Sequence, residues 1–465
     1  MKKDKPILKY KTSKTSLKLS KQYRNILDEL CFYSKNIYNS TLYEIRKHFF
    51  ETGKYLQNEK VYHIIKKNEN YKLLPAQVAQ QTTHIVDRNM KSFFGLLKLK
   101  QKGLYQEKVQ LPKYKNKING RFALIYTPDL FKVDYEKRKL RLSLPKSLKE
   151  RFGLRFLFFD FPKYIKHGTK IKEIRILPKT YNFEMEIVYI NDEQYQQIEN
   201  YDNFISIDLG VNNLLTIYDE KNHKSFIIDG KQMKSYNQYF NKEIAKRQSS
   251  AVKANKKHKT KKIVRLQSKR KNKLRNDLHL ISGRIVKFCV ENDIGNIVVG
   301  YNQEWKQNSN MGRKNNQKFQ NIPFAQLINF IDYKSENHGI RVFLQEESYT
   351  SKCSALDLEI IEKKEEYLGN RIKRGLFRSA NGKAINADLN GSLNILRKFL
   401  VENRYKKVDT SKAEFCLSNL EDRIGNRGAV PAPKRIRVAE LEKFNFDDQT
   451  SLEEKVEFIK NVVNF

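Results

Sequence analysis

Three short apolar segments in close succession constrain the fold of this chain more than any other part of its sequence. Phe204–Asp208, Leu214–Asp219 and Lys224–Ile228 are rich in Ile, Leu and Phe, and Gly210 and Asn222 lie in the connections between them. Short apolar segments separated by turn-forming residues are typical of strands joined by tight turns. We therefore expect three consecutive strands of one sheet.

The segments that follow alternate between helix and strand. A long helical stretch over Met233–Asn292 leads to the apolar run Ile297–Val299, and a helix over Pro323–Asn337 precedes a strand at Ile340–Leu344. Asp388–Leu400 predicts a last helix. This order predicts a mixed sheet flanked by helices, which is the order of an RNase H-like nuclease core.

The first two hundred residues have a different character. Apolar residues recur at helical spacing over Gln22–Phe50 and again from Pro75 to Gly103, so we expect two long helices there. Residues 111–192 carry Pro and Gly between short apolar segments, and Asn182–Ile190 alternates apolar with polar side chains. That alternation is typical of half-buried strands. We expect a small β-barrel in this part of the chain.

The charge balance favours a polyanionic partner. The 465 residues include 91 Lys and Arg against 52 Asp and Glu, a formal net charge of +39. Such a surplus repels itself, and nucleic acid would neutralise it. An anionic membrane surface is the alternative, but the sequence has no apolar run long enough to span a bilayer. The aromatic content of 12% is too high for a disordered basic tail, so we expect a globular protein.

The four cysteines and the N-terminus indicate a reducing compartment. Cys31, Cys289, Cys353 and Cys416 stand far apart with no CxxC pair, which excludes a disulfide framework and a four-thiolate zinc site. The basic N-terminus lacks the apolar stretch of a signal peptide. We expect a cytoplasmic, prokaryotic protein that joins the nucleoid when it is on DNA.

The most basic segment lies in the long helical stretch. Lys253–Arg275 holds 12 Lys or Arg and no acidic residue. Such a run can be a solvated helix face, but the global surplus favours phosphate contacts, which gain free energy from counterion release. The candidate nucleic-acid-binding residues are Lys256, Lys257, Arg265, Lys269, Arg270, Lys271 and Lys273.

Two aspartates are candidates for chemistry. Asp208 ends the first predicted strand shortly before Gly210, at the edge where open α/β sheets bind ligands. The alternative is that this Asp serves only to form the turn. Asp388 begins the last predicted helix, where Asp is also a common N-cap. Together they resemble ligands of a two-metal phosphodiesterase centre. Such a centre clusters three or more carboxylates because Mg²⁺ prefers hard oxygen ligands.

Three sequence blocks carry a family resemblance. Ser-Ile-Asp-Leu-Gly-Val-Asn-Asn-Leu (206–214), Tyr-Thr-Ser-Lys-Cys-Ser (349–354) and Asn-Ala-Asp-Leu-Asn-Gly-Ser (386–392) resemble RuvC-type blocks of the TnpB family. These proteins are encoded by insertion sequences and are related to type V CRISPR effectors. The resemblance runs as far as Pro-Lys-Arg-Ile-Arg-Val in residues 433–438. It implies RNA-guided cleavage of double-stranded DNA by a RuvC nuclease.

The resemblance also implies a multidomain α+β organisation with a β-barrel wedge, a helical recognition domain and a RuvC core. The expected wedge comprises residues 1–20 and 106–199, with the recognition domain inserted at 21–105. The expected nuclease core comprises residues 200–348, including the basic stretch 231–293, and the last helix at 385–408. Residues 349–384 would be a degenerate zinc-ribbon-like insert. Independently of the resemblance, the irregular, Gly- and Pro-containing sequence near the end of the chain predicts a flexible or loosely docked tail at 409–465.

The sequence departs from the family at the middle catalytic glutamate. The family usually has a Glu at the end of its fourth strand, where this chain has Gly300. The fifth predicted strand ends in Glu346 and Glu347, and neighbouring strands lie about 4.8 Å apart, so a carboxylate there could reach the same metal. We expect a relocated catalytic Glu, with Glu347 favoured over Glu346 and over Glu304. The alternative is that both are surface charges on a dead site.

The second departure concerns zinc. The family often inserts a zinc ribbon with two CxxC pairs before its last Asp, and only Cys353 remains of them here. We expect no structural zinc, and an insert held by packing and charge pairs instead. The single tryptophan, Trp305, could stack on a base, although a packing role is favoured.

The interpretation that follows is an RNA-guided, Mg²⁺-dependent DNA endonuclease associated with a transposable element. Asp208, Glu347 or Glu346, and Asp388 would hold two Mg²⁺ ions. The partners would be a guide RNA derived from the element and target double-stranded DNA, with no membrane. The alternatives are a nuclease-dead repressor that occupies guide-specified DNA and a transposase that acts without RNA.

Overall fold

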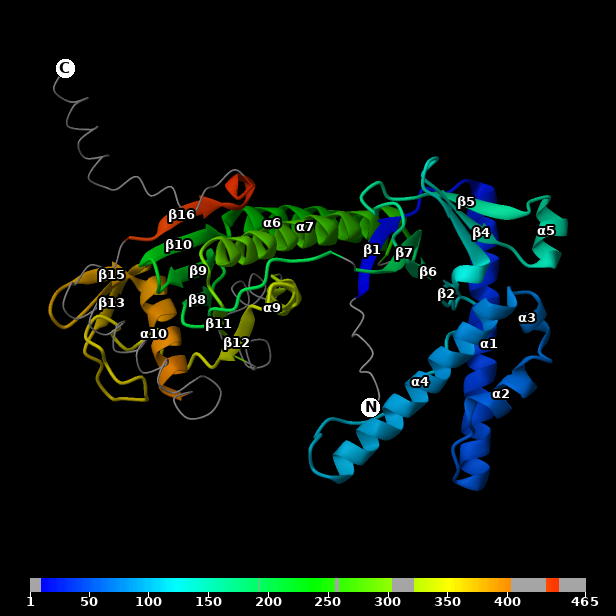
Figure 1. Cartoon of the computed structure of the whole chain (residues 1–465), viewed down its shortest axis with the longest axis horizontal. Coiled ribbons are helices and arrows are strands. Elements are labelled where there is room, and N and C mark those ends of the chain that lie inside the picture. Colours follow the sequence, from blue (N-terminus) through cyan, green and yellow to red (C-terminus); the bar gives the residue numbers. More distant parts are fainter. Residues whose placement is uncertain (1–9, 192, 256–258, 303–321, 403–431, 443–465) are drawn as a thin grey trace, which may run out of the picture. The chain divides into compact units, whose positions relative to one another are not determined.

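The computed structural model describes residues 10–191, 193–255, 259–302, 322–402 and 432–442. Its contacts divide the chain into two compact units, residues 1–193 and 194–465, both of which combine helices with sheets (Figure 1). This mixed multidomain α+β architecture is the one expected. No helix of the described part is long and apolar enough to cross a membrane.

Two long helices dominate the first unit. Helix α1 (Lys21–Thr52) begins where the Ser20 side chain accepts a hydrogen bond from the Tyr23 N–H, and it ends at Gly53, whose φ of 68° suits a residue without a Cβ. Helix α4 (Ala76–Gln101) packs against α1. Both confirm the expected helices. Two shorter helices between them, α2 (Asn58–Ile65) and α3 (Glu69–Lys72), were not foreseen.

The strands of the first unit form two antiparallel sheets. One has the order β1-β7-β6-β2, so the strand nearest the N-terminus pairs with the last strand of the unit, and the other has the order β3-β4-β5. The strands are β1 (Tyr10–Ser16), β2 (Leu124–Tyr126), β3 (Phe131–Asp134), β4 (Lys139–Ser143), β5 (Phe156–Asp160), β6 (Ile171–Pro178) and β7 (Phe183–Ile190). The short helices η1 (Pro128–Leu130) and α5 (Lys146–Phe152) connect them.

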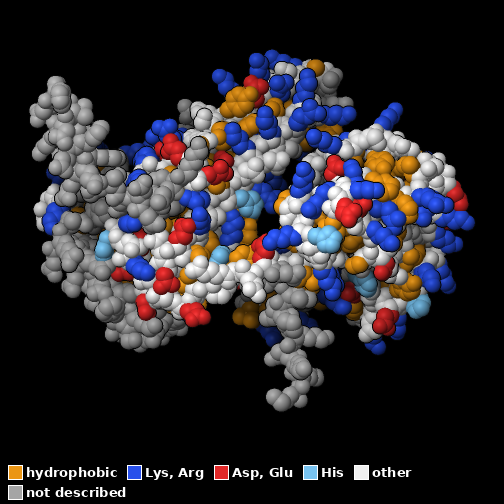
Figure 2. Space-filling model, turned by 45° about the horizontal axis from the view of Figure 1, so that its top comes forward, with side chains coloured by type: hydrophobic (Ala, Val, Ile, Leu, Met, Phe, Trp, Pro, Cys, Tyr) orange, Lys and Arg blue, Asp and Glu red, His pale blue; other side chains and the backbone are white. Residues whose placement is uncertain are grey.

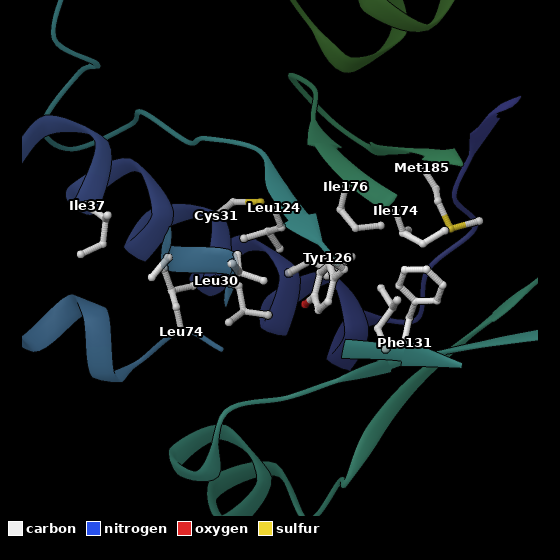
Figure 3. Close-up of a cluster of buried hydrophobic side chains, with 14 of the residues drawn as sticks. Leu30, Cys31, Ile37, Leu74, Leu124, Tyr126, Phe131, Ile174, Ile176 and Met185 are labelled. Atoms are coloured by element: carbon white, nitrogen blue, oxygen red, sulfur yellow. The ribbon is translucent and has the colours of Figure 1, made fainter. Parts of the chain in front are cut away.

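A single apolar core joins the helices to the sheets of this unit. Leu30 and Cys31 from α1 lie beside Leu124 and Tyr126 from β2, with Ile176 from β6 close by (Figure 3). These side chains are all buried. The helical and β parts of residues 10–191 therefore fold around one shared interior.

The second unit is built on a six-stranded sheet of order β12-β11-β8-β9-β10-β16. Its strands are β8 (Phe204–Leu209), β9 (Asn213–Asp219), β10 (Lys224–Asp229), β11 (Asn296–Gly300), β12 (Arg341–Gln345) and β16 (Lys434–Arg437). The first three are antiparallel neighbours, and β11 and β12 run parallel to β8. The helices are α6 (Lys231–Asn255), α7 (Lys261–Glu291), α9 (Phe324–Glu336) and α10 (Ala387–Glu402). This confirms the order of strands and helices expected from residue 204 to residue 400.

Different helices cover the two faces of this sheet, and the alternation of side chains along a strand shows which residue faces which helix. Ile205 and Ile207 share a core with α7 and α9, whereas Phe204 and Val298 share a core with α10. Because successive side chains of a strand point to opposite faces, position 208 lies on the α10 face.

The end of the chain differs from the tail that we expected. Lys434–Arg437 form β16, which pairs in parallel with β10 in the register Ile228↔Ile436. Ile436, Val438 and Leu441 are buried in the core that α7 covers, and η2 (Val438–Glu440) follows the strand. The expectation of a loosely docked tail is therefore wrong for residues 434–441. The alternation of basic and apolar residues in Lys-Arg-Ile-Arg-Val was the available signal for a strand.

Candidate active site

Asp208 lies at the end of β8 and faces helix α10. Two residues earlier on the same face, the Ser206 hydroxyl is 3.0 Å from that of Ser392, so strand and helix are in close contact. A Cβ atom on Gly391 would lie 3.3 Å from Asp208 Oδ2. The absence of a side chain at residue 391 lets the Asp208 carboxylate approach the helix.

Asp388 lies in the first turn of α10 and is held from two sides. The Asn213 side-chain amide donates a hydrogen bond of 2.5 Å to Oδ2, and the Arg371 guanidinium donates one of 3.1 Å to Oδ1. The cap of this helix is Asn386, whose Oδ1 accepts from the backbone N–H groups of Asp388 and Leu389. The alternative that Asp388 is only an N-cap is therefore wrong, because its side chain is used elsewhere.

Glu347 follows β12 and lies against Gly300 of β11. A Cβ atom on Gly300 would come 3.0 Å from Glu347 Cγ, closer still to Glu347 Oε1, and 2.5 Å from Ile395 Cδ1 of α10. The Glu347 side chain thus lies where a residue 300 side chain would begin. Gly300 is the position at which the resembled family has its middle Glu.

Glu346 points elsewhere. Its carboxylate accepts a 2.6 Å hydrogen bond from Lys398 and a 2.7 Å bond from the Ser348 N–H, and its side chain is 52% exposed. Partial burial opposes ionisation, but the hydrogen bonds from Lys398 and Ser348 hold the pKa of Glu346 below its usual value. Glu346 is engaged with the outer part of α10.

The three carboxylates follow one face of α10. Asp388 is on that face, Asp208 reaches it at Gly391, and Ile395 borders the point at Gly300 that Glu347 occupies. Gly391 and Ile395 follow Asp388 at helix spacings of three and then four residues. In the parallel pair β8/β11, Val299 is opposite Ile207, which brings Gly300 next to Asp208. Among the described residues, no three His, Cys, Asp or Glu side chains are close enough to hold a metal ion as they stand.

Electrostatics couple the two aspartates. Burial, and then the negative charge of Asp388, raise the pKa of Asp208 from its ordinary 3.8 to about 7, while Arg371 acts in the opposite direction. A buried carboxylate beside a second carboxylate favours a bound cation. The positive charge would offset both the cost of burying negative charge and the repulsion between the two groups. The donors are all oxygen, which suits Mg²⁺.

The insert before Asp388 is organised by a buried glutamate. The Glu359 side chain is 1% exposed, and its two oxygens accept from the N–H groups of Ser354 and Leu368 at 2.7 and 3.2 Å. Lys364 lies 3.5 Å away. Strands β13 (Asn370–Lys373), β14 (Leu376–Arg378) and β15 (Ala384–Asn386) form a small antiparallel sheet in this insert.

Helix α10 holds the other side of the insert. Its Asn390 and Asn394 amides donate to the Cys353 carbonyl, and Arg397 donates to the Glu359 carbonyl. Cys353 is buried, with its sulfur 3.6 Å from the Ile360 carbonyl oxygen. Hydrogen bonds, packing and the Lys364 ion pair therefore hold the described insert together. That no zinc is needed stays a prediction.

The basic helices α6 and α7 run side by side (Figure 1). Arg265, Lys269 and Lys271 on α7 are exposed, and the Lys273 ammonium lies 3.4 Å from the Tyr236 ring centroid. Lys and Arg side chains outnumber Asp and Glu on the face shown in Figure 2. Arg270 differs, because it donates to Asn237 and Asn241 of α6 and so ties the two helices together. Lys256, Lys257, Glu304 and Trp305 lie outside the described residues.

Sequence reasoning missed two residues of this site. Arg371 stands in the insert 17 positions before Asp388, and no spacing rule connects them. Asn213 was within a block that carried the resemblance, but its contact with Asp388 joins β9 to α10 across the fold. The one available signal was an Asn directly at the start of a strand next to the candidate Asp208.

Two family models and a curated relative match this chain. A family model described as "Probable transposase" (OrfB_IS605) matches residues 186–306, and one described as "Cas12f1-like, TNB domain" matches residues 324–395. The chain is 26% identical over 409 residues to the TnpB-like protein ORF457 of Acidianus two-tailed virus, covering 82% of this chain and 85% of that protein. The resemblance to the TnpB family is thereby confirmed.

A solved structure shares the fold. The cryo-EM structure of a Cas12f1-sgRNA-target DNA complex matches with a TM-score of 0.50 and 16% sequence identity. The match covers 81% of this chain and 83% of the other. At this identity the likeness concerns the fold alone.

Proposed function

We propose that this chain, a TnpB-like protein, is an RNA-guided DNA endonuclease of a transposable element. It would hydrolyse phosphodiester bonds at Asp208, Glu347 and Asp388. The observation that carries the proposal is the position of these three carboxylates along one face of α10, with Glu347 lying where a side chain of Gly300 would start. Three regions that are distant in the sequence thus bring acidic groups to one edge of the sheet.

The donor set fits divalent magnesium. Asp208, Glu347 and Asp388 offer only hard carboxylate oxygens. The raised pKa of Asp208 reflects its burial first and then repulsion from Asp388, and the positive charge of a cation would offset both. These side chains would draw closer around two ions. When bound, such ions lower the pKa of a water nucleophile and stabilise the leaving oxygen of the phosphodiester.

Arg371 has a defined role in this proposal. In the absence of metal, its guanidinium balances the charge of Asp388 at Oδ1. With cations held by the carboxylates, the Arg371 guanidinium would be available beside the site to bind a phosphate oxygen of the DNA, because guanidinium groups pair well with phosphate. Arg371 would therefore help to orient the scissile strand.

The proposed partners are a guide RNA and double-stranded target DNA. The net charge of +39 and the exposed cations of α7 support a polyanion partner, and the solved relative contains an sgRNA and target DNA. We assign residues 21–105 to a recognition domain and residues 1–20 with 106–199 to a wedge barrel. Residues 200–348 and 385–408 would form the RuvC core. The basic helices would recognise the backbone of the guide–target heteroduplex by its charge and shape rather than by its bases.

The test begins with the RNA that accompanies the purified full-length protein. Sequencing should give one abundant species with a variable end. That RNA, with Mg²⁺ and a matching DNA target, should then support cleavage that Asp208→Ala abolishes while DNA binding persists. Cleavage that Asp208→Ala leaves intact would contradict the proposed site.

One observation favours a second candidate function. Gly300 lacks the carboxylate that the resembled family has at this position, as in a nuclease-dead repressor that only occupies DNA. RNA-dependent DNA binding without any metal-dependent cleavage would support the repressor. A transposase acting without RNA would instead remain active after RNase treatment.

A further inference from the structure

We infer that Arg435, on the C-terminal strand β16, is a positioning residue for Asp388 that acts through Asn213. The inference rests on the proposed function, because it concerns how the carboxylate of that site is oriented. It gives the last described strand of the chain a role in metal binding, in addition to its role in the sheet.

The docking of β16 determines where Arg435 lies. Ile436 is buried and paired with Ile228 of β10, so Arg435 projects to the opposite face of the sheet. There its Nη1 lies 2.7 Å from Asn213 Oδ1 and 3.3 Å from Asp229 Oδ2. Asn213 and Asp229 are themselves cross-strand partners of β9 and β10.

Arg435 determines which way the Asn213 amide points. An amide has one accepting and one donating end, and a guanidinium can only donate. The oxygen of Asn213 must therefore face Arg435, and its NH₂ group then faces Asp388 Oδ2 at 2.5 Å. With the amide reversed, its oxygen would face the carboxylate oxygen, and the hydrogen bond would be replaced by repulsion.

The residues that hold Asp388, directly or through a neighbour, come from separate parts of the fold. Arg371 binds Oδ1 from the insert, Asn213 binds Oδ2 from β9, and Arg435 orients Asn213 from β16. Partners of metal-ligating groups fix the orientation of the ligand, and their loss typically lowers metal affinity or activity by about 10- to 100-fold. If Arg371 leaves Oδ1 when cations bind, Asn213 is the contact that keeps Asp388 oriented.

A matched pair of variants tests the inference in the full-length protein. Arg435→Met removes the donor at similar side-chain length. Arg437→Met is the control, since Arg437 has the same chemistry and faces the same side of the same strand, but its side chain is 78% exposed and pairs only with nearby Glu440 in the described contacts. Arg435→Lys keeps a donor and should lie nearer to wild type than Arg435→Met does.

Two readouts are needed. The first is the affinity of the RNA-free protein for Mn²⁺ alone, measured from the EPR signal of the free ion. The second is the rate of guided DNA cleavage. We expect Arg435→Met to lower both by about 10-fold, the low end of the loss seen when a direct partner of a metal ligand is removed, with an unchanged melting temperature. Arg437→Met should match wild type in both.

A double-mutant cycle separates positioning from simple strand docking. In an Asn213→Leu background, Arg435→Met should cause no further loss of Mn²⁺ affinity, because both changes break the same chain of hydrogen bonds. Additive losses, or an Arg435→Met protein indistinguishable from Arg437→Met, would overturn the inference. If Asp208→Ala abolishes cleavage while Arg435→Met does not weaken it, only this inference fails. If Asp208→Ala cleaves normally, the proposed function fails.

Discussion

Glu347 packs against the backbone of Gly300, with its Cγ 3.0 Å from the point where a Cβ of residue 300 would lie. Gly300 is the last residue of β11 and pairs with Gln345, the last residue of the neighbouring parallel strand β12. Glu347 follows Gln345 by two positions. The glycine and the displaced glutamate are therefore complementary. A side chain at residue 300 and the present position of Glu347 exclude each other.

The two adjacent glutamates should behave differently. Glu347→Gln should lower the rate of guided cleavage by about 100-fold or more, since it removes a proposed ligand of metal ions that stabilise the transition state by several kcal/mol. Glu346→Gln weakens only the contacts with Lys398 and Ser348 outside the proposed site and should leave the rate nearly unchanged. Rates measured with saturating Mg²⁺ check this. Equal rates in the two variants would argue against Glu347 as a metal ligand.

Gly300→Ala should destabilise the second unit. The added Cβ would lie 2.5 Å from Ile395 Cδ1 and 3.0 Å from Glu347 Cγ, so side chains must shift, at a cost of about 1–3 kcal/mol. Ile395→Val removes Cδ1, and the double variant Gly300→Ala/Ile395→Val should recover part of that loss. Urea unfolding measures the free energy of unfolding of the single and the double variant. A Gly300→Ala protein as stable as wild type would contradict the close packing.

The raised pKa of Asp208 predicts that the metal-free protein loses folding stability as the pH rises. The folded state holds this proton up to about pH 7, whereas the unfolded state releases it near its ordinary value of 3.8. Rising pH between these values therefore lowers the free energy of unfolding, and the penalty is complete above pH 7. Asp208→Asn removes it, so this variant should gain more stability over wild type at pH 8 than at pH 4. Denaturant unfolding in EDTA measures the difference, and a pH-independent difference would contradict it.

Glu359 should contribute strongly to the stability of the insert. Glu359→Gln replaces one accepting oxygen with an NH₂ group that faces a backbone N–H, which should cost about 1–3 kcal/mol. Glu365 is exposed, and Glu365→Gln should change little. A zinc chelator should leave the melting temperature of the wild type unchanged. Stoichiometric zinc in the purified protein, or melting that a chelator lowers, would show that the insert depends on metal.

Much of the second unit could be predicted from local patterns. The strands at β8, β9 and β10 are short apolar segments between turn residues, and the expected bounds differ from the observed ones by about a residue. The helices α9 and α10 follow from apolar periodicity in the same way. The segment that became β16 is only four residues long, and its basic side chains obscured the buried Ile436.

The site needed information of another kind. Glu346 and Glu347 are adjacent in sequence and identical in type, so the sequence favoured Glu347 without a local pattern that separates the two. Their difference arises because one faces Lys398 and the other faces Gly300 and Ile395. Arg371 and Arg435 were two among 91 cations until the fold brought them to Asp388 and Asn213.

Periodicity, turn residues and charge act over a few neighbouring positions, and they were sufficient to predict the strands β8 to β10, the long helices and the basic character of this chain, and to single out Asp208 and Asp388 as candidates. The choice of Glu347, the direction of the Asn213 amide and the strand at 434–437 depend on contacts between residues that are tens to hundreds of positions apart. Such contacts form only when β8, β11, α10 and the end of the chain pack together, because burial and hydrogen-bond direction are properties of the packed surfaces and not of any single segment.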